Sequence, residues 1–267
     1  MSNYSHYQAL KVEVTDKVAV ATLNRPPYNA MNRTLIHELH NVWADLTDDD
    51  DVHAIVLTGA GDYFSVGGDV KQMSERPGGD FLNEGEKPYR SKSRDMVHDI
   101  LNCDKPIISA INGACAGLAA TAALFCDISV MAEDAKILDP HARVGLVAGD
   151  GGAIIWPMLI GPNRAKEYLM RGKAITGTEA ERIGLVNYVR PKHEVLPTAM
   201  ELARELADGA TWAVRWTKLC VNKSIKDQVN LALDAGHALE RITMSMADHA
   251  EASTAFKEKR KPSYKGY

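Results

Sequence analysis

The order of strand-like and helix-like segments limits what this chain can fold into. Short apolar runs with the length and β-branched content of strands occur at residues 12–14, 18–23, 54–58, 106–111 and 127–132. Apolar residues at helical spacing fill residues 34–46, and a small-residue helix is predicted at 116–125. Two strands followed by a helix recur along the chain. This β-β-α order predicts an α/β fold of stacked turns rather than an open doubly wound sheet.

The C-terminal part of the chain has a different pattern. From about residue 200 to residue 256 the sequence predicts only helix, and a basic tail follows at residues 257–261. A boundary near residue 198 therefore separates two regions. We expect residues 1–198 to form the mixed core and residues 199–267 to form a helical appendage.

Charge and cysteine usage exclude several classes of protein. The net charge of the 267 residues is -4, which argues against a basic protein that coats nucleic acid. The chain has no apolar stretch of about 18 residues, and its beginning does not resemble a signal peptide, so we expect no membrane partner. The 4 cysteines form no CxxC pair and have apolar neighbours. They are predicted to be reduced core thiols of a cytoplasmic protein.

Two glycine clusters are candidates for binding an oxygen atom. The cluster SVGGD at residues 65–69 leaves the Gly68 N–H free of a neighbouring Cβ. The cluster GACAGL at residues 113–118 opens the small-residue helix, whose first N–H groups have no partner inside the helix. Two such donors aimed at one point would form an oxyanion hole. For each cluster taken alone, a tight turn with close packing is the favoured interpretation.

A series of motifs, in order along nearly the whole chain, resembles the enoyl-CoA hydratase/isomerase (crotonase) superfamily. The N-terminal matches are VAVATLNRP at 18–26, NAM at 29–31, IVLTGAG at 55–61 and FSVGGDV at 64–70. The later matches are KPIISAING at 105–113, CD at 126–127, AERIGLV at 180–186 and AFKEKR at 255–260. The resemblance implies a ClpP-like spiral core of ββα turns and a C-terminal helical region that builds homotrimers or hexamers.

The resemblance also implies how a coenzyme A thioester is bound. The N–H groups of Gly68 and Leu118 are expected to bind the thioester oxygen, although the family usually has glycine where this chain has Leu118. Asp69 is expected to brace its loop. The residues expected to contact coenzyme A are Arg25, Tyr28, Ala30, Val70, Phe256 and Lys259. Coenzyme A enters as part of the substrate, and neither a separate cofactor nor a metal ion is expected.

This chain departs from the family at the catalytic positions. Hydratases of the family hold water with two glutamates, and the corresponding residues here are Thr121 and His141. Neither is a carboxylate, so the two-glutamate mechanism cannot be carried over. We expect His141 to serve as the general base and acid, with Asp150 fixing its tautomer. Asp150 precedes two glycines and a predicted helix, so a purely structural helix cap is the alternative.

The region around His141 and Asp150 resembles 6-oxocamphor hydrolase, a crotonase relative that cleaves a carbon–carbon bond with water. That enzyme uses a further histidine on the helix after Asn-Gly, where this chain has Leu118, so this resemblance is incomplete. Three functions stay open from the sequence. The first is a lyase that adds water to an enoyl-CoA, the second a hydrolase of a β-diketone or β-oxo acyl-CoA, and the third a non-catalytic scaffold that binds coenzyme A.

Overall fold

A six-stranded sheet forms the centre of the molecule. The structure is a computed structural model that describes residues 4–69 and 92–267. The strand order is β1-β2-β3-β4-β6-β9, and all neighbours run parallel except the β1/β2 hairpin. The bounds are β1 Leu10–Thr15, β2 Val18–Leu23, β3 Ala54–Gly59, β4 Ile107–Ile111, β6 Ile128–Ala132 and β9 Tyr188–Arg190. All residues of β3 and β4 are buried, as expected for inner parallel strands.

A second, smaller sheet completes each turn of the chain. It contains β5 (Cys115–Ala116), β7 (Lys136–Leu138) and β8 (Ile175–Thr176), in the order β5-β7-β8. Two isolated bridges, Met31 with Gly68 and Ser65 with Cys115, continue the same pattern toward the N-terminus. The chain thus passes from the large sheet to the small sheet and then into a helix, for example through β4, β5 and α4. The predicted α/β spiral of ββα turns is confirmed.

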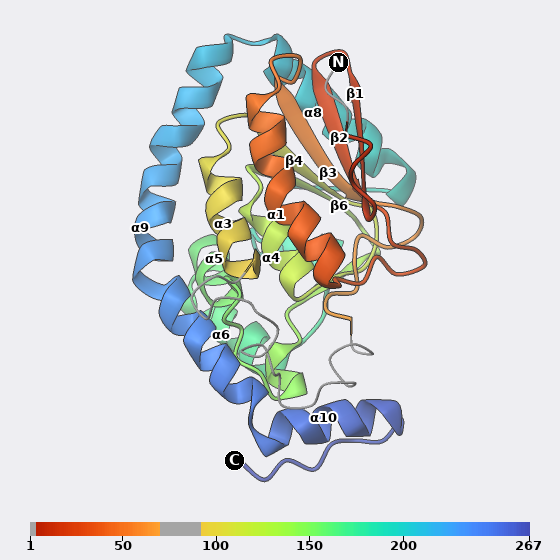
Figure 1. The fold of residues 1–267 in the computed structure, drawn as a ribbon, viewed down its shortest axis with the longest axis vertical. Helices are drawn as coiled ribbons and strands as arrows, with labels where there is room; N and C mark the ends of the chain where they lie inside the picture. The colour runs from red at the N-terminus through yellow and green to blue at the C-terminus, as the bar shows by residue number, and fades with distance from the viewer. Residues whose placement is uncertain (1–3, 70–91) are drawn as a thin grey trace.

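Helices cover both faces of the large sheet (Figure 1). On one face lie α1 (Arg33–Asp48), α3 (Lys92–Asn102) and α4 (Leu118–Phe125), and on the other lies α8 (Lys192–Asp208). The apolar residues of α1 that the sequence spacing selected are all buried, and Asn32 accepts a hydrogen bond from the Leu35 N–H as the N-cap. Small residues in α4 allow this helix to sit in the middle of the molecule, where every side chain of it is buried.

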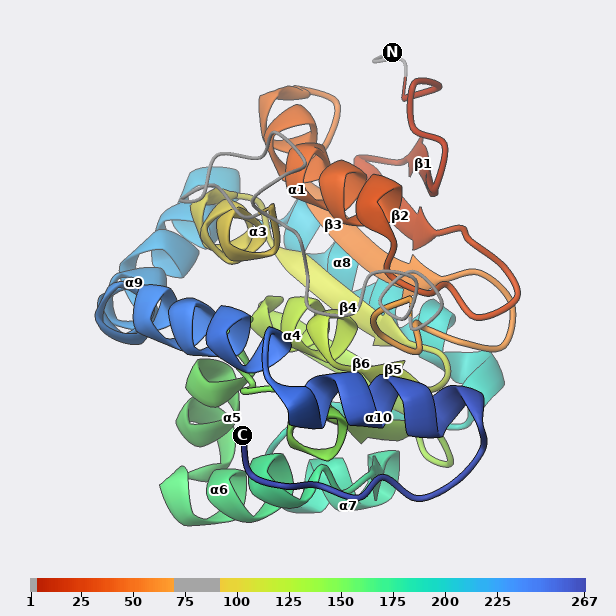
Figure 2. The same ribbon diagram turned by 60° about the horizontal axis from the view of Figure 1, so that its bottom comes forward.

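The C-terminal helices wrap around the core. The long helix α9 (Thr211–Met244) runs along α3 and α5 (Gly152–Ile160), and α10 (Ala247–Lys257) crosses the end of the molecule, where it contacts residues 141–144 (Figures 1 and 2). The predicted boundary at residue 198 falls inside α8, which packs on the sheet, so the chain leaves the core only after Asp208. The shorter helices are η1 His141–Val144, α6 Pro162–Arg171 and α7 Gly177–Arg182.

None of the helices in the described residues combines the length and the apolar character that a membrane span requires.

Candidate active site

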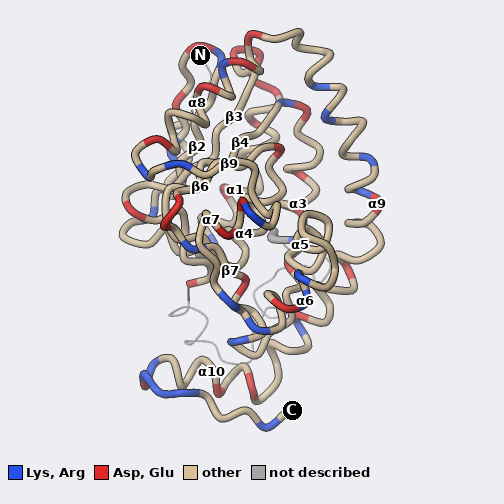
Figure 3. The backbone as a smooth tube through the Cα atoms, turned by 180° about the vertical axis from the view of Figure 1, so that it is seen from behind, with Lys and Arg blue, Asp and Glu red and all other residues tan. Residues whose placement is uncertain are grey.

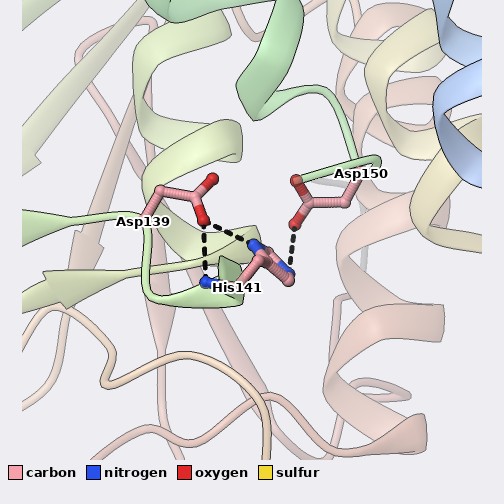
Figure 4. Close-up of side chains that lie close together, drawn as sticks. All are labelled: Asp139, His141 and Asp150. Carbon is pink, nitrogen blue, oxygen red and sulfur yellow. Dashed lines mark hydrogen bonds and ion pairs between the residues drawn. The ribbon is translucent and has the colours of Figure 1, made fainter. Parts of the chain in front are cut away.

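His141 is held by an aspartate only two residues before it. Asp139 Oδ1 accepts a hydrogen bond from the His141 backbone N–H at 3.1 Å and lies 2.6 Å from Nδ1 of the ring (Figure 4). The backbone bond is an Asx turn, the local structure that an Asp-Pro pair favours. One carboxylate oxygen therefore fixes both the backbone and the ring of His141. The Asp-Pro-His run is visible in the sequence, but the sequence pattern alone predicts no role for Asp139.

Asp150 faces the opposite nitrogen of the same ring. Its Oδ2 lies 3.7 Å from Nε2 of His141, while its Oδ1 accepts hydrogen bonds from Thr121 Oγ1 at 3.0 Å and from the Gly152 N–H at 3.3 Å. Asp150 therefore both bonds the first N–H of α5 (Gly152–Ile160) and faces His141. The hydrogen bond that orients the ring belongs to Asp139 rather than to Asp150, as Figure 4 shows.

Glu240 on α9 is a third acid of the site, and sequence reasoning missed it. Its Oε1 lies 3.8 Å from Nε2 of His141, and its side chain is buried. A close backbone contact brings α9 here, because a Cβ on Gly149 would lie only 2.2 Å from the Gly236 carbonyl oxygen and 2.8 Å from Cβ of Glu240. The only sequence signal for this approach is a glycine one turn before Glu240 in a long helix.

Burial and charge set the protonation of this cluster. Burial alone lowers the pKa of His141, but the carboxyl groups of Asp150, Asp139 and Glu240 outweigh it and raise that pKa to about 10. Burial, together with the charge of Asp150, raises the pKa of Glu240 to about 8. Burial also raises the pKa of Asp150, and the His141 charge opposes this rise. At neutral pH the site therefore contains an imidazolium beside a neutral Glu240.

The same side chains are close enough to hold a metal ion. One donor atom each from Asp139, His141 and Asp150 lie within 4.8 Å of one another. However, Nδ1 shares a proton with Asp139 at 2.6 Å, and a positive charge already sits on the ring among the carboxyl groups. The proton that makes the His141 ring positive thus balances the negative charge of the carboxyl groups, which favours acid–base chemistry over metal binding.

The two predicted oxyanion donors lie next to this cluster. The Met31 N–H donates to the Gly67 carbonyl, and the Asp69 N–H donates to the Met31 carbonyl. The Gly68 N–H between them therefore points away from Met31, toward the side of this strand where Ser65 pairs with Cys115. Leu118 is the first residue of α4, and its N–H has no partner inside the helix. Among the described residues, neither N–H donates to a protein group.

Gly117 connects these donors to the ring of His141. It has a φ of 55°, and a Cβ added to it would lie 3.7 Å from Cε1 of His141. The imidazole therefore packs against the turn that presents the Leu118 N–H. A group bound at that N–H would be adjacent to His141.

The residues expected to contact coenzyme A are dispersed over several elements. The Arg25 guanidinium bonds the Ala30 carbonyl at 2.9 Å and Asp69 at 2.8 Å, so it fixes the loop that carries Gly68. Tyr28 is exposed and packs edge-on against Tyr63. Phe256 and Lys259 are exposed at the end of α10, where Lys and Arg gather (Figure 3). Val70 lies outside the described residues.

Comparison with known proteins gives a consistent result. The family model described as enoyl-CoA hydratase/isomerase matches residues 13–267. A short-chain-enoyl-CoA hydratase from Clostridium acetobutylicum is 34% identical over 254 residues, covering 94% of this chain and 95% of the relative. A crotonyl-CoA hydratase from Syntrophomonas wolfei is 31% identical, covering 97% and 98%.

The fold comparison agrees with the sequence comparison. The crystal structure of an enoyl-CoA hydratase/isomerase from Mycobacterium paratuberculosis superimposes with a TM-score of 0.86 at 33% identity, and the match covers 92% of this chain and 97% of that one. Both comparisons extend over nearly the whole molecule, and the family-model match includes the segments that carry His141 and Glu240. The chain therefore belongs to the enoyl-CoA hydratase/isomerase family, a part of the crotonase superfamily.

Proposed function

We propose that this protein is a lyase that adds water to the double bond of an enoyl-CoA thioester. The observation that carries the proposal is the hydrogen bond from Thr121 to Asp150. Thr121 stands where family hydratases have their first glutamate, and its hydroxyl holds a carboxylate from another loop beside α4. His141 stands at the second glutamate position. A carboxylate and an imidazole would thus replace the two glutamates.

The oxyanion hole supplies the main electrostatic stabilisation in this proposal. The N–H groups of Gly68 and Leu118 would bind the thioester oxygen as water adds and negative charge develops there. Both amides lack protein partners among the described residues, as donors awaiting a ligand must. Preorganised donors of this kind contribute on the order of 3 kcal/mol each to transition-state binding.

The proton transfers follow from the charges. The Asp150 carboxylate takes a proton from the attacking water, and the His141 imidazolium gives its Nε2 proton to the α-carbon of the enolate. The starting state returns when Asp150 releases this proton and Nε2 of His141 takes one up, either directly across the 3.7 Å between them or by exchange of both protons with solvent. Asp139 holds Nδ1 throughout, so it takes the orienting role that the sequence had suggested for Asp150.

Substrate and assembly follow the family. The curated relatives are hydratases of short-chain enoyl-CoA and crotonyl-CoA, so we propose an acyl-CoA substrate with no separate cofactor. The basic tail around Lys259 is suited to the phosphates of coenzyme A. The exposed apolar residues of α9, which include Trp216 and Leu231, favour a homotrimer or a hexamer. A cytoplasmic location stays a prediction.

Hydration can be tested by following the absorbance of the conjugated enoyl group with short, branched and cyclic enoyl-CoAs. We expect turnover by the wild type and a loss of roughly 10²–10⁴-fold in kcat for His141→Gln and Asp150→Asn. His53→Gln is the matched control, because His53 is a partly buried histidine whose ring contacts the Ala207 carbonyl rather than any residue of the site. Absence of turnover across the panel, with coenzyme A binding intact, would contradict the proposal.

A carbon–carbon hydrolase is the second candidate. It is favoured by the Asp139–His141 contact of 2.6 Å, because an imidazole held by an aspartate can activate water for attack on a ketone once Nε2 has lost its proton. Cyclic β-diketones and β-oxo acyl-CoAs would then give ring-opened or shortened acids, detectable by mass spectrometry. Formation of such acids that depends on His141, without enoyl-CoA turnover, would select this function. Any His141-dependent turnover would also exclude a purely non-catalytic scaffold.

A further inference from the structure

Glu240 lies between two imidazole rings. Its Oε1 is 3.8 Å from Nε2 of His141, and its Oε2 is 3.5 Å from Nδ1 of His237. Both Oε2 and the His237 Nδ1 are buried and lack a hydrogen-bond partner among the described residues. A carboxyl group in this position can accept a proton on one oxygen and release one from the other.

The helix gives this arrangement a direction. Asp234, His237 and Glu240 are spaced three residues apart on α9, so they lie along one face of the helix. Side-chain exposure falls along this row, from 70% for Asp234 to 12% for His237 and 7% for Glu240. The row of titratable side chains therefore leads from solvent to the buried Nε2 of His141.

The surrounding charges decide which member of the pair carries a proton at rest. Burial, together with Arg241 and Arg94, lowers the pKa of His237 to about 4, so the ring is neutral at pH 7. The His237 ring forms a hydrogen bond with the Gly149 backbone. Its Nδ1 has no hydrogen-bond partner in the described part of the chain, so Nδ1 is free to accept a proton. Glu240, with its pKa of about 8, has a proton to give. The other charged groups that face the pair are Asp139, Asp150, His141 and Asp234.

We propose that Glu240 and His237 form a proton path between His141 and solvent. This path rests on the proposed function, in which His141 loses and regains a proton in each turnover. In the outward step the Nε2–H bond of His141 breaks as an O–H bond forms at Oε1 of Glu240. The Oε2–H bond breaks as an N–H bond forms at Nδ1 of His237. Glu240 stays neutral, and the positive charge moves from one ring to the other.

The remaining steps close the cycle. His237 releases its extra proton to water near Asp234, and the same steps in reverse restore the imidazolium of His141. A movement of the Glu240 carboxyl group by about 1 Å brings either gap to hydrogen-bond length. The path lets the site exchange protons with solvent while a substrate covers the exposed part of His141.

A substrate-free measurement tests the path directly. With ¹⁵N-labelled histidine, NMR gives the rate at which the His141 ring N–H exchanges with water. We expect this exchange to slow about tenfold or more in Glu240→Gln and in His237→Gln, because each variant lacks a titratable relay group. His53→Gln should leave the rate unchanged. An unchanged exchange rate in both relay variants, with the fold intact, overturns the proposal.

Turnover provides a second, separate test. We expect His237→Ala to lower the kcat for enoyl-CoA hydration about tenfold, and added imidazole to restore it in proportion to the concentration of its free base. A loss that imidazole does not restore would assign His237 a structural role only and would overturn the path. If the wild type shows no hydration while the exchange rates respond as expected, the proposed function fails and the proton path stands.

Discussion

The three carboxyl groups around His141 differ in what they do to its ring. Asp139 is at hydrogen-bond distance from Nδ1, whereas Asp150 and Glu240 face Nε2 from farther away. A buried imidazolium is stable only when opposite charge lies near it, and three acids cannot all ionise in so small a space. One acid therefore keeps its proton, and Glu240 is the group whose pKa is raised to about 8.

The first prediction concerns the orienting aspartate. Replacing Asp139 with asparagine removes the negative charge at Nδ1, so the pKa of His141 should fall and kcat should decrease roughly 10–100-fold. NMR titration of the ring and steady-state kinetics measure the two effects. Asp134→Asn, a substitution at an exposed aspartate just before β7, should change neither. A pKa of His141 that stays the same in Asp139→Asn would show that Asp139 does not stabilise the charged ring.

The second prediction concerns stability and pH. Because the pKa of Glu240 is raised from 4.5 to about 8 on folding, the folded state binds this proton more tightly than the unfolded chain. The free energy of unfolding of the wild type should therefore contain a component that falls as pH rises from 4.5 to about 8. Glutamine at position 240 removes that component.

Denaturant titrations of wild type and Glu240→Gln at pH 5, 6, 7 and 8 measure this component of the free energy of unfolding. Below pH 6.5, His141 is protonated in both states, so the difference between the two curves there belongs mainly to Glu240. We expect the variant to gain stability relative to the wild type with each step up in pH. Parallel curves would mean that Glu240 titrates normally in the folded protein.

At the scale of elements, the site depends on one close contact between a loop and a helix. Gly149 and Gly236 let the backbone before Asp150 lie directly on α9, where a side chain on Gly149 would collide with the helix. The same contact places Glu240 beside His141. The position of Glu240 thus depends on where α9 lies, and this approach of α9 depends on two residues that have no side chain.

A single methyl group tests this contact. Gly149→Ala would place a Cβ 2.2 Å from the Gly236 carbonyl oxygen, so we expect a loss of about 1–3 kcal/mol in unfolding free energy together with a lower kcat. In the control Gly209→Ala, the nearest atom to the new Cβ lies at 3.4 Å, an ordinary contact. Its stability should stay within about 0.5 kcal/mol of wild type. If the two variants behave alike, the contact does not position α9.

At the scale of the whole molecule, the spiral fold could be predicted because its signals are local. Each strand is a short apolar run, and α1 shows its buried face in the spacing of Leu35, Leu39 and Val42. His141 and Asp150 could be found because they occupy family positions. Asp139 was present in a readable turn motif, whereas Glu240 comes from a distant helix, and nothing in its local sequence specifies the loop that it meets.

The exposed apolar side chains on α9 lead to a prediction about assembly. Trp212, Trp216 and Leu231 are more than half exposed, which is costly for a helix that faces only water. We expect light scattering to give the mass of three or six chains, and Leu231→Glu to reduce it. Met170→Glu, a substitution at an equally exposed residue of α6, should leave the mass unchanged. A wild-type monomer would show that this face needs no covering chain.

The turn formed by Asp139, Pro140 and His141 has a consequence for engineering. Its imidazole and its supporting carboxylate are neighbours in sequence and are joined by a hydrogen bond to the backbone. Both groups can therefore be transferred together by exchanging three consecutive residues. Exchanging this tripeptide into a relative that bears a glutamate at the same place would convert a lone acid into a self-supported histidine in a single step.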